Sequence, residues 1–594
     1  MILQSLVDYY EILAAAGEIS KPGYCKAKVS YALNISQDGE LLGVIPLKIE
    51  VPRGKKMVEV PQLLEVPEQQ KKTVGIVSNF LCENSAYILG IDNKGKPERT
   101  KQCFEAFKIL HHEVLDGVDC GQAKAVLSFL DDWQPQSVEN CTVITDYLEA
   151  LTSGANITFN ILGLGFAQDS TEIKQAWEKY RESKPDSVEM QCLVTGDIQP
   201  IARLHPSIKG VIGAQSMGAS IVSFNAKAYE SYGRDDQQGL NAPVSEHATF
   251  AYTTVLNYLL SNREYKQSFG DTTVVYWAKS PKKIYQNLFA HTLNPTEASD
   301  EISVDKESEG LIKSVFNNLV QGKPVGNVES AFDKDTKFYI LGLAPNAARL
   351  SVRFFIENSF GNILDKVAQH YRDLEIEKSP NEFEYLPLWK LMSETASPKS
   401  KDKASSPLLS GSVLRSIFSG SPYPQALYNS VMVRIRAERD ITRGKAAIIK
   451  ACLLRNKNEN YKEELTVSLN EHSKNSAYIL GRLFAVLEKA QQDANPGINA
   501  TIKDRYFTSA CATPASVFPI LLRLSNHHIS KAKYGYVNDR RISDLMGKLD
   551  VDNNPFPAHL SLEEQGIFIL GYYHQQKANY VKNEKEENLN VRDN

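Results

Sequence analysis

Three residues, Asp197, His205 and Asp271, are of types that could act as a general acid, a general base and a metal ligand. Together they would indicate a metal-dependent enzyme that processes nucleic acid. The alternative, which we favour, is that they are turn and helix-cap residues, because no histidine–aspartate pair has a further ligand at metal-site spacing. Neither a GxxxxGKS or GxxxxGKT phosphate-binding loop nor a GxSxG nucleophile elbow occurs. We therefore expect no enzymatic activity, no catalytic residue, no cofactor and no metal.

The cysteines give no sign of a metal site either. The eight of them, at positions 25, 82, 103, 120, 141, 192, 452 and 511, form no CxxC pair and have no histidine nearby at ligand spacing. We expect reduced, mostly buried thiols, with a zinc site as the alternative.

A segment from Val194 to Ala278 places polar side chains among seven glycines. Glycine allows close approach of the backbone and positive φ angles. Lys209, Gln215, Ser216 and Asn225 supply ammonium, amide and hydroxyl groups between the glycines. The pattern favours a surface that binds a polar polymer.

Several blocks of the chain also carry a resemblance. They include MILQSLVDYYEILAA, GIVSNFLCENSAYILGID, VTGDIQPIARLHPSIKGVIGAQSMGASIVSFNAKAYESYG, FYILGLAPNAARLSVRFF and SGSPYPQALYNSVMVRIRAERDITRGKAAIIKACLLRN. In this order they resemble the large subunit of the type I-C CRISPR-associated Cascade interference complex. The resemblance extends from residue 1 to about 524, except around residues 380 to 408, and does not include the last several dozen residues.

The resemblance implies a non-catalytic subunit of an RNA-guided surveillance complex for antiviral defence. Such a subunit recognises the protospacer-adjacent motif in double-stranded DNA, assists strand opening, stabilises the R-loop and helps to recruit the helicase-nuclease. The implied partners are guide CRISPR RNA, target double-stranded DNA, the backbone and guide-processing subunits, a small subunit made by internal translation, and the helicase-nuclease. In guided recognition the protein reads the short motif and base pairing reads the rest.

Amide side chains donate and accept hydrogen bonds and therefore suit the readout of base edges. Our candidates for reading the DNA motif are Asn79, Asn84, Lys209, Gln215, Ser216 and Asn225. For each of them, a turn or cap is the alternative role.

A basic segment lies between Leu409 and Lys457 in a chain whose formal net charge is −4. It contains nine lysines and arginines and two acids, and such clusters bind the phosphate backbone through counterion release. The candidates for backbone contact are Arg415, Arg434, Arg436, Arg443, Lys445 and Lys450. The alternative is pairing within a helix, because Arg434 and Arg436 stand four residues before Glu438 and Asp440.

The sequence patterns predict an α+β fold to position these residues. It has a mixed α/β N-terminal portion and a helical C-terminal bundle. With 594 residues, 42% hydrophobic and 23% charged, the composition is that of an ordinary globular protein. We expect an α/β portion at 1–375, a linker or exposed loop at 376–408, a basic helical segment at 409–466, and a bundle at 467–594 with a disordered tail from 582. The N-terminus fits neither a signal peptide nor a membrane span, so we expect a cytoplasmic protein with no membrane partner.

Local patterns predict individual elements. Helices are expected at 2–16 and after a cap at Ser245, a strand pair at 28–46, and strands at TTVVYWA and FYILGLA. Helices at 475–493, 515–523, 539–549 and 562–573 would complete the bundle. The heptapeptide NSAYILG occurs at Asn84 and again at Asn475, but its flanks diverge, so we interpret the copies as two unrelated packed segments.

Overall fold

The computed structural model describes residues 1–53, 56–70, 75–182, 188–231, 233–234, 236–295, 306–321, 332–399, 406–456, 459–549 and 555–590. Within these ranges the chain forms two units, which are described separately. The first contains residues 1–208 and 222–258, and the second contains residues 209–221 and 259–594. No helix in these ranges combines the length and the apolar character needed to cross a bilayer.

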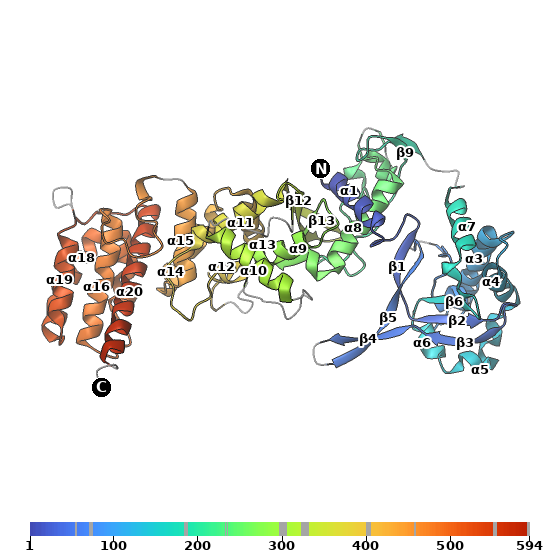
Figure 1. Cartoon of the computed structure of the whole chain (residues 1–594), viewed down its shortest axis with the longest axis horizontal. Helices are drawn as coiled ribbons and strands as arrows, with labels where there is room; N and C mark the ends of the chain where they lie inside the picture. The colour runs from blue at the N-terminus through green and yellow to red at the C-terminus, as the bar shows by residue number, and fades with distance from the viewer. Residues whose placement is uncertain are drawn as a thin grey trace. The chain divides into compact units, whose positions relative to one another are not determined.

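The first unit contains a four-stranded sheet of order β3-β2-β6-β7 (Figure 1). Its strands are β2 (Tyr31–Ile35), β3 (Leu41–Pro46), β6 (Ile157–Ile161) and β7 (Gly165–Phe166). The β2–β3 pair is antiparallel around residues 36–40, which confirms the predicted strand pair, and β2 runs parallel to β6. Three helices, α3 (Pro97–Leu115), α4 (Gly121–Asp132) and α7 (Thr171–Glu182), contribute to the core of this part, where aromatic residues such as Phe107 and Phe159 are fully buried.

A second sheet of this unit has the order β1-β5-β4. Its strands are β1 (Tyr24–Val29), β4 (Lys48–Arg53) and β5 (Lys56–Pro67). The remaining elements of the first unit are α1 (Ile2–Ala15), α2 (Ser85–Ile88), α5 (Thr142–Thr145), α6 (Leu148–Thr152), β8 (Glu189–Gln191), β9 (Ile198–Pro200) and most of α8 (Glu246–Ser261). The predicted helices at 2–16 and after Ser245 are thereby confirmed, and the Ser245 hydroxyl accepts from Ala248 N at 3.2 Å as a cap does.

The second unit is built on an antiparallel sheet of order β10-β11-β12-β13. Its strands are β10 (Lys266–Phe269), β11 (Thr272–Ala278), β12 (Lys337–Asn346) and β13 (Arg349–Ser359). Every residue of β11 is buried, which explains the continuous apolar run TTVVYWA. Helices α9 (Ile284–Leu293), α11 (Phe360–Leu374) and α13 (Pro407–Ser419) pack on this sheet, with α10 (Lys306–Val320) against α9 and α11.

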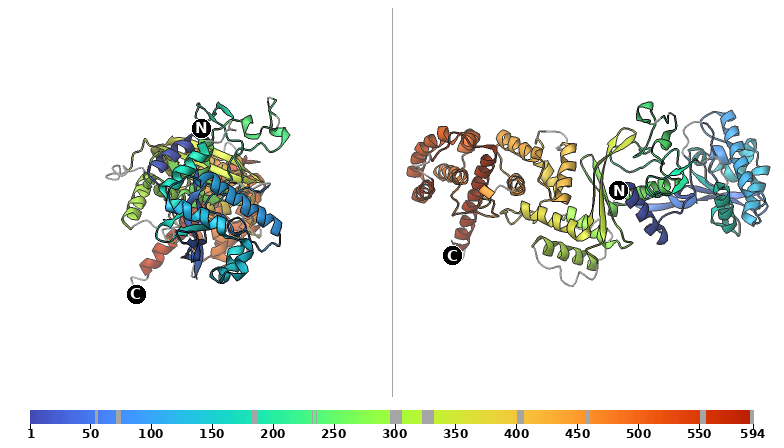
Figure 2. Two further views of the ribbon diagram at one scale, coloured as in Figure 1. Left: turned by 90° about the vertical axis from the view of Figure 1, so that its right-hand side faces the viewer. Right: turned by 90° about the horizontal axis from the view of Figure 1, so that it is seen from above.

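The C-terminal helices continue the same unit. They are α12 (Leu388–Ser393), α14 (Gln425–Glu438), α15 (Arg443–Arg455), α16 (Ser476–Ala494), α17 (Ile502–Ala512), α18 (Pro514–Lys531), α19 (Gly535–Met546) and α20 (Leu562–Asn590). Helix α16 packs against α18, α19 and α20, and the orange and red ribbons of Figure 1 and of the right-hand view of Figure 2 show this bundle. The α+β fold and the helical C-terminal bundle are thus confirmed.

Helices α16 and α20 are in especially close contact. A Cβ atom on Gly481 of α16 would lie 1.9 Å from the carbonyl oxygen of Phe568, and one on Gly571 of α20 would lie 2.2 Å from that of Tyr478. Each helix therefore places a glycine against the backbone of the other. Around this crossing, Tyr572 donates to the buried carboxylate of Glu488 at 2.6 Å.

Two expected boundaries differ from the structure. The interval 376–408 is not a linker throughout, because α12 lies within it and buries Leu388, Leu391 and Met392 in the core of the second unit; residues 400–405 lie outside the described ranges. That core is continuous from Val274 to Tyr573, so the bundle shares it with the sheet. Helix α20 runs to Asn590, over most of the tail that the polar composition predicts to be disordered, and residues 591–594 are outside the described ranges.

Candidate nucleic-acid interface

Loop 209–221 presents three of the predicted motif-reading residues together. Lys209, Gln215 and Ser216 are exposed, and the neighbouring Met217 is 78% exposed. The loop is held on the second unit's sheet: Ile212 N donates to Thr273 Oγ1 at 3.2 Å, and Ser220 exchanges backbone hydrogen bonds with Ala348 and Leu350. A fixed loop with exposed amide and hydroxyl groups can offer hydrogen bonds to a ligand without first being ordered.

Glycines allow this loop to follow the surface closely. Gly210 and Gly213 have φ angles of +90° and +77°, in the left-handed region that favours glycine. A Cβ atom at Gly210 would lie 3.1 Å from the carbonyl oxygen of Leu260, and one at Gly213 would lie 3.2 Å from Pro345. The positive φ angles and the close approaches to Leu260 and Pro345 therefore explain why glycine stands at these two positions of the segment.

Asn225, the fourth candidate in this segment, is exposed but belongs to the first unit. The six predicted motif-reading residues are thus divided between the units. Asn79 and Asn84 also lie in the first unit.

Asn79, which is buried, and Asn84, which is partly exposed, both make hydrogen bonds within the protein. Both donate from Nδ2 to the buried carboxylate of Glu83, each at 3.0 Å. The Asn79 side-chain oxygen accepts from Gln70 N at 2.8 Å, and that of Asn84 accepts from Ala86 N at 3.1 Å as the N-cap of α2. In this conformation these amides stabilise the loop and cap the helix, which is the alternative role that the sequence left open for them.

The loop that these asparagines stabilise is strained and firmly held. Leu81 has a φ of +57°, which a branched side chain rarely adopts. Its N–H donates to Nε2 of His111 at 3.1 Å, and its carbonyl accepts from Thr158 Oγ1 at 3.2 Å. Burial lowers the pKa of His111 to about 3, so the ring is neutral and can accept this bond.

Four cations of the basic segment are buried. Arg443, Lys445, Lys450 and Arg455 all lie on α15 and are between 2% and 8% exposed. Lys445 Nζ contacts Glu438 Oε2 at 2.6 Å, and Arg455 Nε contacts Asp373 Oδ2 at 2.7 Å. Side chains paired in the interior cannot contact phosphate, so the prediction of backbone contact is wrong for Arg443, Lys445 and Lys450.

Three of these four cations bind backbone carbonyls at or just beyond the C-terminal ends of neighbouring helices. Lys450 Nζ donates to the carbonyl of Asp373 in the last turn of α11, and Arg455 Nη1 donates to that of Ser416 in the last turn of α13. Lys445 Nζ also donates to the carbonyl of Asp440, just beyond α14. Helix C-termini carry unpaired carbonyls and partial negative charge, so cations stabilise them. Helix α15 therefore joins three helices through its charged residues.

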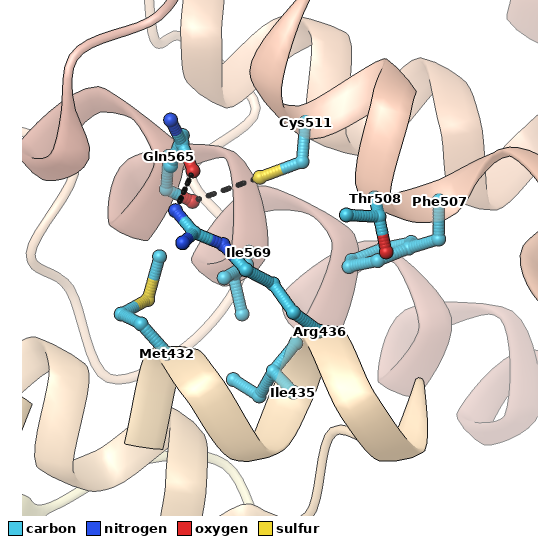
Figure 3. Close-up of a pocket in the computed structure, with 8 residues that line it drawn as sticks. All are labelled: Met432, Ile435, Arg436, Phe507, Thr508, Cys511, Gln565 and Ile569. Atoms are coloured by element: carbon cyan, nitrogen blue, oxygen red, sulfur yellow. Dashed lines mark hydrogen bonds between the residues drawn. The ribbon is translucent and has the colours of Figure 1, made fainter. Parts of the chain in front are cut away.

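The other basic candidates have mixed surroundings. Arg415 is exposed, and Arg434 pairs with Glu438 at 3.5 Å, as the alternative interpretation predicted. Arg436 donates from Nη2 to Gln565 Oε1 at 2.7 Å instead of pairing with Asp440. The pocket beside Arg436, drawn in Figure 3, has a volume of about 10 Å³ and includes Cys511 and Ile569. This space suits one water molecule and is too small for a nucleotide.

An exposed basic surface that the sequence interpretation missed lies on α18 and α19, and we call it the α18–α19 surface. Between Ile502 and Leu549 the chain has eight lysines and arginines and three aspartates. The exposed residues of the surface are Arg523, His527, Lys531, Lys533, Tyr534, Tyr536 and Arg540, with the two tyrosines 60% and 71% exposed. The four-residue spacing of the first three places them on one helix face, a signal that the sequence contained.

The three residues of the alternative enzyme are divided between the two units. Asp197 and His205 belong to the first unit and Asp271 to the second. His205 is buried against the Tyr252 hydroxyl at 2.6 Å, and burial lowers its pKa to about 4. Asp271 accepts from Arg353 at 2.9 Å. Among the residues that the structure describes, no three histidine, cysteine or acidic side chains are grouped to hold a metal ion, and the eight cysteines form no disulfide.

A comparison with known protein families gives a match over most of the chain. The model of the family described as CRISPR-associated protein (Cas_Csd1) matches residues 6–580 of the chain. Among curated proteins, none matches.

Proposed function

Because the chain belongs to the CRISPR-associated Cas_Csd1 family, we propose that it is the non-catalytic large subunit of a cytoplasmic type I-C RNA-guided surveillance complex. In this role it recognises the protospacer-adjacent motif in double-stranded DNA, assists strand opening and helps to recruit the helicase-nuclease. Its partners are the guide RNA, the target DNA and the other CRISPR-associated subunits. The observation that carries the proposal is the family match over residues 6–580.

Motif recognition is assigned to loop 209–221. The exposed amide of Gln215 both donates and accepts, as readout of a base edge requires. Lys209 brings a positive charge to the same loop, and positive φ angles at Gly210 and Gly213 bring its backbone close to the sheet. Rigid attachment lowers the entropic cost of binding.

Contact with an opened DNA strand is assigned to the α18–α19 surface. Single strands are bound by cations that follow the phosphates and by aromatic rings on which bases stack. Arg523 and Lys531 supply charge on one helix face, while Tyr534 and Tyr536 are exposed enough to stack. Arg415 is a further exposed cation of the second unit.

The proposal is tested by purifying the chain with the products of its neighbouring genes. A single RNA species of fixed length should copurify. The resulting complex should bind a DNA duplex with the correct flanking motif more tightly than one without it. Gln215→Ala should reduce this discrimination by about 1–3 kcal/mol, while Gln102→Ala, which changes an exposed glutamine of α3, should not. Wild-type discrimination in Gln215→Ala would contradict the assignment of the loop.

The absence of catalysis is part of the proposal and has its own test. The isolated chain should not cleave DNA or hydrolyse ATP with magnesium or manganese. Cleavage that Asp271→Ala abolishes would instead support the metal-dependent nucleic-acid-processing enzyme.

We also propose that a small subunit arises by internal translation of the C-terminal part. Its start would lie between Leu465 and Ser476, for example at Val467, and it would extend to Asn594. In the full chain α20 packs against α15, and Tyr428 donates to the Leu562 carbonyl at 2.8 Å. A separate fragment would expose this face of α20 and would need another subunit to cover it. Intact-mass analysis of the assembled complex should detect the fragment. An active complex without the fragment would refute the proposal of a small subunit made by internal translation.

A further inference from the structure

The β12–β13 hairpin ends in a strained two-residue turn. Asn346 and Arg349 form the last pair of the two strands, so Ala347 and Ala348 make the turn. Ala347 has a φ of +52°, a conformation in which two-residue turns usually place glycine or asparagine. Such a residue keeps this conformation only where the surrounding structure holds it, and strain of this kind is concentrated at binding sites.

Loop 209–221 holds this turn at two points. Ser220 N donates to the Ala348 carbonyl at 3.1 Å. At the other end of the contact, a Cβ atom at Gly213 would lie 3.2 Å from Pro345, so the loop and the hairpin touch there as well. The loop and the turn therefore belong to one surface of the second unit.

Between these two contacts the loop is longer than the turn. It has six residues, 214–219, where the hairpin has two, 346–347. The additional residues bow away from the hairpin and form a tight turn of their own, in which Gly218 N donates to the Gln215 carbonyl at 2.9 Å. Its central residue Met217 is 78% exposed. Two tight turns thus project from the same surface.

Each of these turns carries one side-chain amide, on Gln215 and on Asn346. Both amides are exposed, and neither makes a hydrogen bond to another group in the part of the chain that the structure describes. An amide offers donors and an acceptor in one plane, which is the pattern that pairs with the edge of a base. The fold therefore places a second group of the required chemistry next to the predicted reading loop.

The charge of this surface suits nucleic acid. Residues 209–221 and 345–350 together contain one lysine, one arginine and no acidic residue. The carboxylate of Asp271, which precedes β11 next to the end of β12, is paired with Arg353 at 2.9 Å. Both turns can therefore approach phosphates without repulsion and bring their amides to the base edges between them.

We propose that Asn346 is a second motif-reading residue, and that the turn at 215–218 and the β12–β13 turn bind the same short stretch of target duplex. This inference rests on the proposed function, because that function supplies duplex DNA as the ligand. Asn346 lies outside the glycine-rich segment of the sequence, and only the fold brings it to the reading loop.

The test uses the guide-RNA complex assembled with the full-length chain. Its affinity is measured for duplexes in which each base pair of the flanking motif is changed in turn. Asn346→Ala should lower discrimination about 5- to 140-fold at one base pair, next to the base pair at which Gln215→Ala lowers it. The matched control, Asn93→Ala, changes an exposed asparagine of the first unit and should bind every duplex within twofold of wild type.

A second variant separates base reading from folding of the turn. Asn346→Asp keeps the size and the turn preference of asparagine but replaces the N–H donors with an acceptor. It should lower discrimination at the same base pair as Asn346→Ala, with hydrogen exchange of the β12 and β13 peptides as in the wild type. If only Asn346→Ala accelerates this exchange, the result of Asn346→Asp decides.

Three results overturn the inference. Wild-type discrimination in both Asn346 variants shows that this residue does not read bases. An equal loss of affinity for every duplex shows that it contacts only the DNA backbone. A loss at a base pair that is not next to the one affected by Gln215→Ala shows that the two turns do not bind the same stretch. A wild-type complex that ignores the flanking motif instead contradicts the proposed function itself.

Discussion

The crossing of α16 and α20 gives a prediction whose size can be derived from the structure. In Gly481→Ala the new Cβ atom would lie 1.9 Å from the Phe568 carbonyl oxygen, so the two helices must separate by about 1 Å. Such overpacking typically costs 1–3 kcal/mol. Alanine is preferred to glycine in a helix by about 1 kcal/mol, which offsets part of that cost. We expect a net loss of up to about 2 kcal/mol in the free energy of local unfolding.

Gly310→Ala is the matched control. Gly310 lies in α10, and no atom would lie within 4 Å of its added Cβ. Only the gain in helix propensity applies there, so this variant should stabilise its helix by about 0.5–1 kcal/mol. Gly571→Ala should behave like Gly481→Ala. The double variant at the crossing should lose less than the sum of the single losses, because the helices have already separated.

Hydrogen–deuterium exchange with peptide resolution is the appropriate assay, since a large multi-part chain has no single free energy of unfolding. Peptides from α16 and α20 should exchange up to about 30 times faster in Gly481→Ala, and peptides from α10 more slowly in Gly310→Ala. Slower exchange of α16 in Gly481→Ala would refute the close crossing, because it would mean that the added methyl group meets open space.

Three further predictions concern buried cations, acid stability and aromatic stacking. Arg455→Met removes a buried partner of Asp373 and should destabilise the packing of α15 against α11 by about 3–5 kcal/mol, measured by hydrogen exchange of their peptides. The exposed Arg523→Met should leave this exchange unchanged and lower the slope of log affinity against log salt by about one; the reverse pattern would contradict the assigned burial. Burial lowers the pKa of His370 to about 3 and that of His574 to about 4. As the pH falls from about 6.5 towards 4, the unfolded state therefore takes up protons that the folded state does not. The free energy of unfolding falls by up to about 1.4 kcal/mol per unit of pKa difference at each site. Melting temperatures between pH 7 and pH 4 should show this loss, and His574→Phe should reduce it; a pH-independent melting temperature would exclude it. Tyr534→Ala should weaken single-stranded DNA binding by the complex by about 1–3 kcal/mol if bases stack there, while the buried Tyr276 is not available for such contact; unchanged binding would exclude stacking on Tyr534.

The heptapeptide NSAYILG marks the limit of what local sequence can predict. In both copies the asparagine caps a helix, since Asn84 precedes α2 and Asn475 precedes α16. The final glycines differ: Gly90 has a φ of +71° beyond the end of α2, whereas Gly481 lies inside α16 against α20. The start of each helix follows from the local sequence, and its length depends on what packs against it. Our interpretation of two packed, unrelated segments agrees with this difference.

The basic segment shows a second limit. Strands such as β11 and the helical bundle follow from periodicity and β propensity, and both were predicted. The burial of the α15 cations could not be predicted in this way. Lys445, Lys450 and Arg455 look like phosphate ligands until the ends of α11, α13 and α14 are placed beside them. Charge in sequence indicates that a counter-charge is needed, and only tertiary structure shows whether that partner is a helix end or a nucleic acid.

The placement of loop 209–221 has a consequence for synthesis on the ribosome. Its neighbours in sequence on both sides belong to the first unit, yet Ser220 pairs with Ala348 and Leu350, about 130 residues later. At roughly 5–20 residues per second, the emerging chain carries this loop unattached for about 6–26 s. During that time Val211 and Ala219, both buried in the finished protein, are exposed to chaperones and proteases. The segment that we assign to DNA recognition is thus among the last of the N-terminal residues to reach its final conformation.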